Sequence, residues 1–203
     1  NLAGMGKIGL PVPPGFTITT EACKAYLTKG KAPAELAAEV TAHLATVEQA
    51  MGRTLGDPIN PLLVSVRSGA AFSMPGMMET VLNIGLNDDS VLGLAGMAGE
   101  RFAWDSYRRL LQMFGKTVLG IDSEVFEARI EQVKHARRIV EDTELTAADL
   151  AALCGSFKTA IFNATGERFP QDPRQQLDAA VEAVFRSWSG DRAVLYRRQE
   201  RIP

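Results

Sequence analysis

Several features that would assign a protein class at once are scarce in this sequence. Its 203 residues include only two cysteines, Cys23 and Cys154, and no Cys-X-X-Cys pair. Isolated cysteines without a nearby histidine exclude a disulfide framework, a zinc site and a dithiol redox centre. We therefore predict that both cysteines are small, buried, apolar residues.

An excess of one charge and long apolar runs are also lacking. Lysine and arginine number 22 and aspartate and glutamate 24, for a formal net charge of -2. A nucleic-acid-binding protein carries a clear basic excess, so we expect no nucleic-acid partner. The apolar runs fall far short of the roughly 20 residues that span a bilayer, and no signal pattern precedes them. We expect no membrane segment and, by default, a cytoplasmic location.

What the sequence does have is enough apolar content, 46% of its residues, to bury a core as one large or two modest domains. The chain begins at Asn1 without a methionine and stops at Pro203 without a polar tail. We interpret it as a piece of a longer protein.

The first 87 residues mix helix and strand signals. Helical spacing predicts one helix over 1–9 and another from Pro33, while Thr20 is the predicted N-cap of a helix between them. Clusters of β-branched and aromatic residues predict strands over 16–19, 62–66 and 80–84. The last two strands predict a hairpin with a long connection.

From Asp88 onward only helix signals remain. Amphipathic spacing predicts helices from 88–89, over 101–114 and over 125–140. Capping patterns at Thr146 and at Asp172-Pro173, with Gln175 at the third helical position, predict two more. The predicted fold class is α+β, a short β-sheet followed by a mainly α-helical part. We expect three parts: 1–87 with the hairpin, 88–170 as a helical subdomain, and 171–203 as helices returning to the first part.

The connection between the hairpin strands, VRSGAAFSMPGMMET at 66–80, offers little side chain to pack. Gly69 and Gly76 allow backbone N–H groups to converge on an anion, and Arg67 adds a planar fork that binds phosphate through two bonds. Phosphoryl transfer requires mainly that phosphates be positioned and neutralised. A Gly- and Met-rich hairpin tip is more often a plain turn or a hydrophobic contact, so spacing alone leaves these interpretations open.

The arginines also have a purely structural interpretation. Arg67 can end its strand in an ion pair with a carboxylate. Asp105 precedes Arg108 and Arg109 by three and four residues, which predicts that at least one of the two is an ion-pair partner worth under about 1 kcal/mol.

Five separated blocks of the chain resemble, in order, the N-terminal nucleotide-binding region of the pyruvate phosphate dikinase family. They are IGLPVPPGFTITTEAC at 8–23, VRSGAAFSMPGMMETVLNIGLND at 66–88, RFAWDSYRRLLQMFG at 101–115, FPQDPRQQL at 169–177 and AVFRSWSGDRAVLYRR at 183–198.

The resemblance implies a partial ATP-grasp-type subdomain with a helical insertion over 88–170. It implies that the full-length protein converts ATP, inorganic phosphate and pyruvate to AMP, pyrophosphate and phosphoenolpyruvate through a phosphocarrier histidine on a separate domain. It further implies Mg²⁺, whose ligands are expected outside this chain, and a full-length homodimer. The fragment alone is predicted to be inactive.

The resemblance also assigns roles to single residues. Arg67 matches the family's phosphate-binding arginine and Arg109 the second arginine of its Tyr-Arg-Arg, so both are expected to be catalytic. Ala71 stands where the family usually has a second loop arginine, and Glu79 where it usually has aspartate. The residues expected to bind the nucleotide phosphates are Arg67, Ser68, Gly69, Ser73, Met74, Gly76, Met77, Met78 and Thr80, and none is assigned to metal.

Two other functions compete with this prediction. A phosphoenolpyruvate synthase shares the domain type, but Met-Pro-Gly-Met-Met at 74–78 favours the phosphate-using enzyme. A noncatalytic helical interaction module that keeps an ancestral loop is the second alternative, and Arg67, Gly69, Gly76 and Arg109 argue against it.

Overall fold

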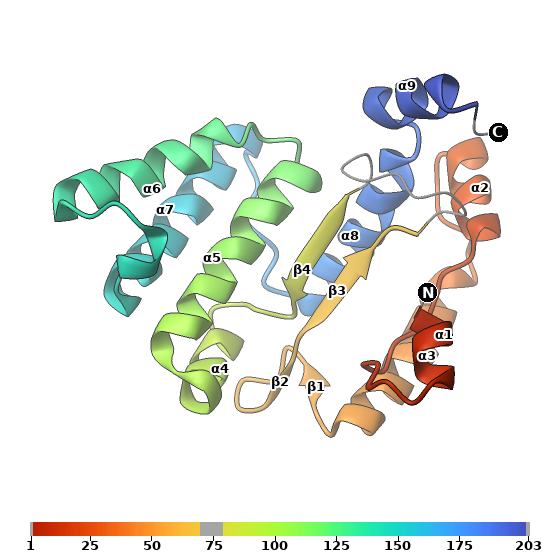
Figure 1. Ribbon diagram of the computed structural model, residues 1–203, viewed down its shortest axis with the longest axis horizontal. Helices are drawn as coiled ribbons and strands as arrows, with labels where there is room; N and C mark the ends of the chain where they lie inside the picture. Colours follow the sequence, from red (N-terminus) through yellow and green to blue (C-terminus); the bar gives the residue numbers. More distant parts are fainter. Residues whose placement is uncertain (1, 70–78, 202–203) are drawn as a thin grey trace. The chain divides into compact units, whose positions relative to one another are not determined.

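The computed structural model describes residues 2–69 and 79–201 (Figure 1). The chain divides into two compact units, residues 1–53 and 54–203, and each is described by itself. The predicted limits at 87 and 170 fall inside the second unit. These two limits divide the chain into parts with different expected roles rather than into compact units, and they remain predictions.

The first unit is helical in its described residues. Helix α3 buries Val40, Leu44 and Val47 along one face, as their spacing predicts, and ends at Gly52, whose φ of 62° is left-handed. The helices of this unit are α1 Leu2–Lys7, α2 Thr20–Lys29 and α3 Leu36–Met51.

The strand predicted over 16–19 is wrong. These residues form no strand, and Phe16 instead stacks on the ring of His43, with centroids 5.6 Å apart. β-branched and aromatic residues favour strands only where a neighbouring strand supplies hydrogen bonds and a surface, and Phe16 finds a helix side chain instead. The N-cap of α2 is Thr19 rather than Thr20, and α3 begins three residues after Pro33.

The second unit contains the β-structure, as two pairs of strands. β1 Thr54–Leu55 runs parallel to β2 Pro61–Leu62, and β3 Val64–Arg67 runs antiparallel to β4 Thr80–Ile84. The hairpin prediction is confirmed, although the strand predicted over 62–66 is divided between β2 and β3. The register shifts between Val64 and Val66, as in a β-bulge.

Helices make up the rest of the second unit, and the predicted α+β class is confirmed. The capping predictions locate two helix starts: Thr146 Oγ1 accepts from Asp149 N, and the Asp172 carboxylate accepts from Arg174 N. Gln175 makes no reciprocal bond with the described residues. The helices are α4 Ser90–Ala98, α5 Glu100–Thr117, α6 Glu124–Arg137, η1 Asp142–Glu144 (a 3₁₀ turn), α7 Ala147–Thr165, α8 Pro173–Ser187 and α9 Asp191–Gln199.

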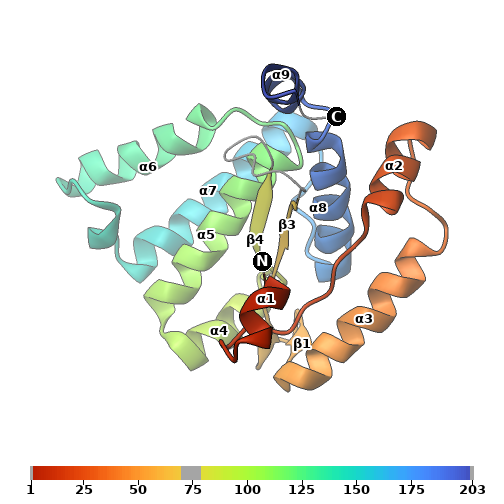
Figure 2. The same ribbon diagram turned by 45° about the vertical axis from the view of Figure 1, so that its right-hand side comes forward.

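Helix α5 is the centre of this unit. It packs against β4 on one side and α7 on another, with α6 beyond α7, and α8 packs against both hairpin strands (Figures 1 and 2). Tyr107, Phe114 and Phe169 form an edge-to-face aromatic group with centroids 5.2–6.1 Å apart. Phe102, in the first turn of α5, is 56% exposed although its neighbour Ala103 is fully buried.

Candidate functional site

The candidate site begins where β3 ends. Val64 and Val66 are half-buried while Ser65 and Arg67 are exposed, so the alternation of the strand turns the Arg67 side chain outward. Arg67 pairs with Thr80 across the hairpin, which puts both side chains on the same face. Arg67 makes no hydrogen bond or ion pair with any residue in the described part of the chain.

The residues after Arg67 form what we call the loop end of the hairpin, namely Arg67, Ser68, Gly69, Glu79 and Thr80. Ser68 is half-buried, and Gly69 is exposed with no atom within 4 Å of an added Cβ. The other predicted loop residues lie outside the described residues: Ser73, Met74, Gly76, Met77 and Met78, and with them Ala71.

Helix α5, which carries Arg109, packs against strand β4 of the hairpin. Two contacts fix its direction: Thr117 Oγ1 donates to Glu79 at 3.2 Å, and Asn83 Nδ2 donates to the Ser106 carbonyl at 3.0 Å. The helix therefore runs antiparallel to β4. Arg109 follows Ser106 by three residues, about 4.5 Å of helix rise, on an element that contacts the strand leading from the loop end.

The two arginines of Tyr107-Arg108-Arg109 lie in different environments but share one carboxylate. Arg108 is only 5% exposed, and its Nη2 lies 2.6 Å from Asp105 Oδ1. The Arg109 side chain is 60% exposed, and its Nε lies 2.9 Å from Asp105 Oδ2. The prediction that at least one arginine pairs with Asp105 is confirmed for both.

The arginines set the charge state of Asp105. Burial by itself raises the pKa of this carboxyl, but the hydrogen bonds and charges of Arg108 and then Arg109 outweigh it, so the pKa lies below its usual range. Asp105 is ionised at neutral pH. The group of two guanidinium ions and one carboxylate keeps a net positive charge.

Two hollows on the described surface lie away from Arg67 and Arg109. One is an apolar hollow of about 460 Å³ beside α4, lined by residues that include Ile59, Leu92 and Met97. The other, about 430 Å³, is lined by α7 residues, Asp88 and the segment 168–171. Neither arginine is among the residues that line these two hollows.

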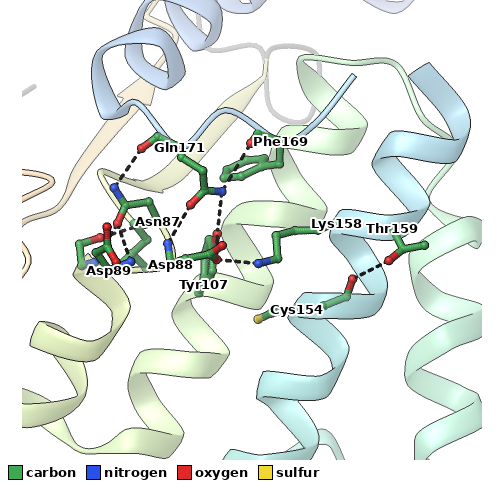
Figure 3. A network of polar contacts seen from close by, with 12 residues as sticks. Asn87, Asp88, Asp89, Tyr107, Cys154, Lys158, Thr159, Phe169 and Gln171 are labelled. Carbon is green, nitrogen blue, oxygen red and sulfur yellow. Dashed lines mark hydrogen bonds and ion pairs between the residues drawn. The ribbon is translucent and has the colours of Figure 1, made fainter. Parts of the chain in front are cut away.

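Three residues that line the second hollow, Asp88, Lys158 and Gln171, belong to a network of polar contacts (Figure 3). Asp88 Oδ1 accepts from the Tyr107 hydroxyl at 2.9 Å and from Lys158 Nζ at 2.6 Å, and the Asp88 N–H donates to Gln171 Oε1 at 2.9 Å. Asn87 Nδ2 donates to the Gln171 carbonyl at 2.9 Å. Because its members bond to one another, this network supports packing between α5, α7 and the β4–α4 turn.

Neither candidate nucleophile near this network is activated. Burial raises the pKa of the Tyr107 hydroxyl and raises that of the Cys154 thiol to about 12, so both stay protonated at neutral pH. Cys154 is buried as predicted, whereas Cys23 is only half-buried, and both are free. The described cysteines give no support to thiolate chemistry.

Gln176 anchors what we call the base of the hairpin, residues 83–90. It is fully buried, its Oε1 accepts from the Gly85 N–H at 3.0 Å, and its Nε2 donates to the carbonyls of Leu86 at 2.9 Å and Pro170 at 2.8 Å. Gly85 has a φ of 109°, and a Cβ there would lie 2.6 Å from the Leu62 carbonyl oxygen. Sequence reasoning missed Gln176, because its partners lie up to 91 residues away.

Among residues 2–69 and 79–201, no three His, Cys, Asp or Glu side chains come together as a metal ion would require. No helix in this part of the chain has the length and apolar character needed to cross a bilayer.

The chain was also compared with known proteins. The family model described as "Pyruvate phosphate dikinase, AMP/ATP-binding domain" matches residues 30–203. The chain belongs to this family. The resemblance seen in the five sequence blocks is thus confirmed, and the hairpin, Arg67 and Arg109 all fall inside the matched range.

Individual members of the dikinase family are similar along the whole chain. Pyruvate, phosphate dikinase 1, chloroplastic, of Zea mays is 55% identical over 203 residues, and the chloroplastic enzyme of Flaveria trinervia is also 55% identical. Pyruvate, phosphate dikinase 2 of Oryza sativa subsp. japonica is 55% identical over 202 residues. The chain covers 21%, 21% and 23% of these relatives, so it corresponds to about a fifth of a dikinase.

Proposed function

We propose that this chain is the nucleotide-binding part of a pyruvate phosphate dikinase, and that the loop end of its hairpin binds the phosphates of ATP. The observation that carries the proposal is Arg67, an exposed arginine without a partner among the described residues, at the start of a connection that contains two glycines. An unpaired guanidinium offers two parallel N–H bonds to a phosphate and loses no existing ion pair on binding.

Each remaining loop-end residue has a stated role in the proposal. The Ser68 hydroxyl and the Gly69 N–H add neutral donors, and Thr80 lies on the same face as Arg67. Ser73, Met74, Gly76, Met77 and Met78 complete the phosphate-binding loop. Arg109 supplies the second guanidinium, directed at inorganic phosphate. Together these residues would position the phosphates and neutralise their charge, which is most of what phosphoryl transfer requires.

The reaction of the full-length protein is part of the proposal. ATP would transfer its terminal pyrophosphoryl group to a histidine on another domain and release AMP. Inorganic phosphate would then take the terminal phosphoryl group as pyrophosphate, and pyruvate would take the remaining one as phosphoenolpyruvate. We infer Mg²⁺ with ligands outside these 203 residues, as the resemblance to the dikinase family implies. The ATP-grasp fold, the homodimer and the cytoplasmic location belong to the same proposal, although several relatives are named chloroplastic.

The alternatives are less well supported. The relatives reported above are named dikinases, which favours the phosphate-using reaction over that of a synthase. A noncatalytic module needs no exposed, unpaired arginine at a glycine-containing connection. For the 203-residue chain alone we expect weak or undetectable ATP affinity, and sub-micromolar binding by calorimetry would contradict this.

Arg67→Ala in the full-length protein is the test of the proposal. We expect the ATP half-reaction to slow by roughly two to three orders of magnitude, as the loss of one preorganised donor commonly does. The matched control is Arg168→Ala, which removes another exposed arginine beside α7 and should leave the rate unchanged. A change under threefold for Arg67→Ala would remove Arg67 from the site.

Arg109→Ala tests the second guanidinium. We expect it to raise the KM for inorganic phosphate while the first phosphorylation, measured without phosphate, is affected less. Unchanged phosphate dependence would contradict the role of Arg109.

A further inference from the structure

Asp105 uses its two carboxylate oxygens for two different arginines. Oδ1 accepts from Arg108 Nε at 3.0 Å and from Arg108 Nη2 at 2.6 Å. Among the described residues, Oδ2 accepts from Arg109 Nε alone, at 2.9 Å. One turn of α5 thus links a buried arginine to an exposed arginine through a single carboxylate.

The buried side of this group is rigid. Arg108 is 5% exposed, and its remaining terminal nitrogen, Nη1, donates to Gln112 Oε1 at 2.9 Å. A guanidinium held by two partners inside the fold has one orientation, so the Oδ1 edge of Asp105 is fixed as well. The carboxylate plane is therefore set by Arg108 and Gln112 before Arg109 binds to it.

The exposed side of the group has spare donors. Arg109 bonds Asp105 through Nε, and neither of its terminal nitrogens makes a hydrogen bond with a described residue. Those two nitrogens form an edge of the guanidinium that binds an anion through parallel bonds. Because the side chain is 60% exposed, an anion can reach this edge.

We infer that Asp105, fixed by Arg108 and Gln112, is a positioning residue that holds Arg109 with its two terminal nitrogens directed at inorganic phosphate. The inference rests on the proposed function, since it specifies how that arginine is presented. Ordering a long side chain in advance removes part of the cost of immobilising it when the anion binds.

Asp105 also has an effect that would oppose phosphate binding by Arg109. Its negative charge, close to Arg109, would weaken anion binding if it did nothing else. The charge is shared with Arg108, however, so the three groups together still carry one positive charge. If Asp105 positions Arg109, removing the carboxylate should raise the KM for inorganic phosphate. If Asp105 instead neutralises Arg109, removing it should lower that KM.

Asp105→Asn in the full-length protein separates the two effects. Positioning predicts that the KM for inorganic phosphate rises roughly threefold to tenfold, with kcat changed less than twofold, because a disordered arginine must be immobilised on binding. A variant that merely destabilised the fold would lower kcat through loss of active protein and leave this KM unmoved. A decrease in the KM would overturn the inference, since it would mean that Asp105 acts by neutralising Arg109.

Two further variants make the test specific. Asp105→Glu keeps the charge but lengthens the side chain, so we expect the KM for phosphate to rise again, and an unchanged KM would contradict positioning. The double variant Asp105→Asn with Arg109→Ala should be no worse than Arg109→Ala alone, and additive effects would show that Asp105 acts elsewhere. If Asp105→Asn fails to fold, Gln112→Met loosens Arg108 from outside the pair and should raise the same KM by a smaller factor, whereas no rise would overturn the inference.

The outcome for Arg109→Ala separates the inference from the proposal on which it rests. If that variant leaves the KM for phosphate unchanged, the proposed role of Arg109 fails and the inference fails with it. If Arg109→Ala raises the KM and Asp105→Asn does not, only the positioning role is overturned.

Discussion

The base of the hairpin, residues 83–90, and its loop end differ in how their polar groups are used. At the base, Gln176, Ser90 and Asn87 bond the turn that follows β4, and Asp88 bonds Tyr107 and Lys158 (Figure 3). Across the described residues, no buried side-chain nitrogen or oxygen lacks a hydrogen-bond partner. The polar groups of the base are hydrogen-bonded within the protein, so few donors or acceptors are left there for a ligand.

At the loop end the donors point outward. Arg67 and Gly69 are exposed, and Arg67 has no partner among the described residues. The base is thus held by many bonds to distant segments, whereas the loop end is tied to α5 through Thr117 and Glu79 while Arg67 has no partner among the described residues. Substitutions at the base should therefore reduce stability, whereas substitutions at the loop end should reduce activity.

Gln176→Leu should have the largest effect on stability. It leaves the buried N–H of Gly85, the buried carbonyl of Leu86 and the half-buried carbonyl of Pro170 without this partner, so we expect the free energy of unfolding to fall by about 3–5 kcal/mol. Urea denaturation measures this, with exposed Gln175→Leu as the adjacent control. A loss below about 1 kcal/mol would mean that the base is not the anchor.

Tyr107→Phe removes one hydroxyl from the polar network and keeps the ring in the core. We expect a loss of about 1–2 kcal/mol in the free energy of unfolding, because Asp88 and Gln171 lose a shared partner. Tyr196→Phe is the control, since the Tyr196 hydroxyl makes no hydrogen bond with the described residues. Equal effects of the two substitutions would contradict a structural role for the network.

The pH dependence of stability should contain a smaller contribution from Asp105. Its pKa is lowered in the folded state, so the stability it adds is present above the unfolded pKa of about 3.9 and is lost as pH falls through the folded pKa. We expect this to amount to about 1 kcal/mol or less, since the group is partly exposed. Urea denaturation at a series of acidic pH values gives the free energy of unfolding as a function of pH. For Asp105→Asn this free energy should fall less steeply toward low pH than in the unmodified protein, and an equal slope would contradict the contribution of Asp105.

Arg67→Ala should have the smallest effect on stability. It therefore gives the clearest contrast between the loop end and the base of the hairpin. An exposed side chain without a described partner is expected to change the free energy of unfolding by less than about 0.5 kcal/mol. Glu182→Gln, which loosens the surface pair with Arg186 at 3.7 Å, should be equally mild. A loss above about 1 kcal/mol for Arg67→Ala would identify Arg67 as a structural residue.

Much of the fold could be predicted because its signals are local. Leu36, Val40, Leu44 and Val47 recur at helical spacing, and Thr146 and Asp172 mark helix starts through bonds to residues two or three positions away. The strand at 80–84 has the predicted limits. The signal at 16–19 is equally local, and it failed because a strand requires a distant partner.

The sequence by itself determined that Arg67 ends a strand before a glycine-containing connection, and that Asp105 lies within reach of Arg108 and Arg109. These facts depend only on spacing along the chain, which helix and strand geometry convert directly into neighbours. Only the tertiary structure decided that Arg108 is buried while Arg109 is exposed, that Gln176 holds Gly85, and that Asp88 meets Lys158. Burial and long-range hydrogen bonds depend on how distant segments pack, and the residues next to a given position in the sequence do not specify that packing.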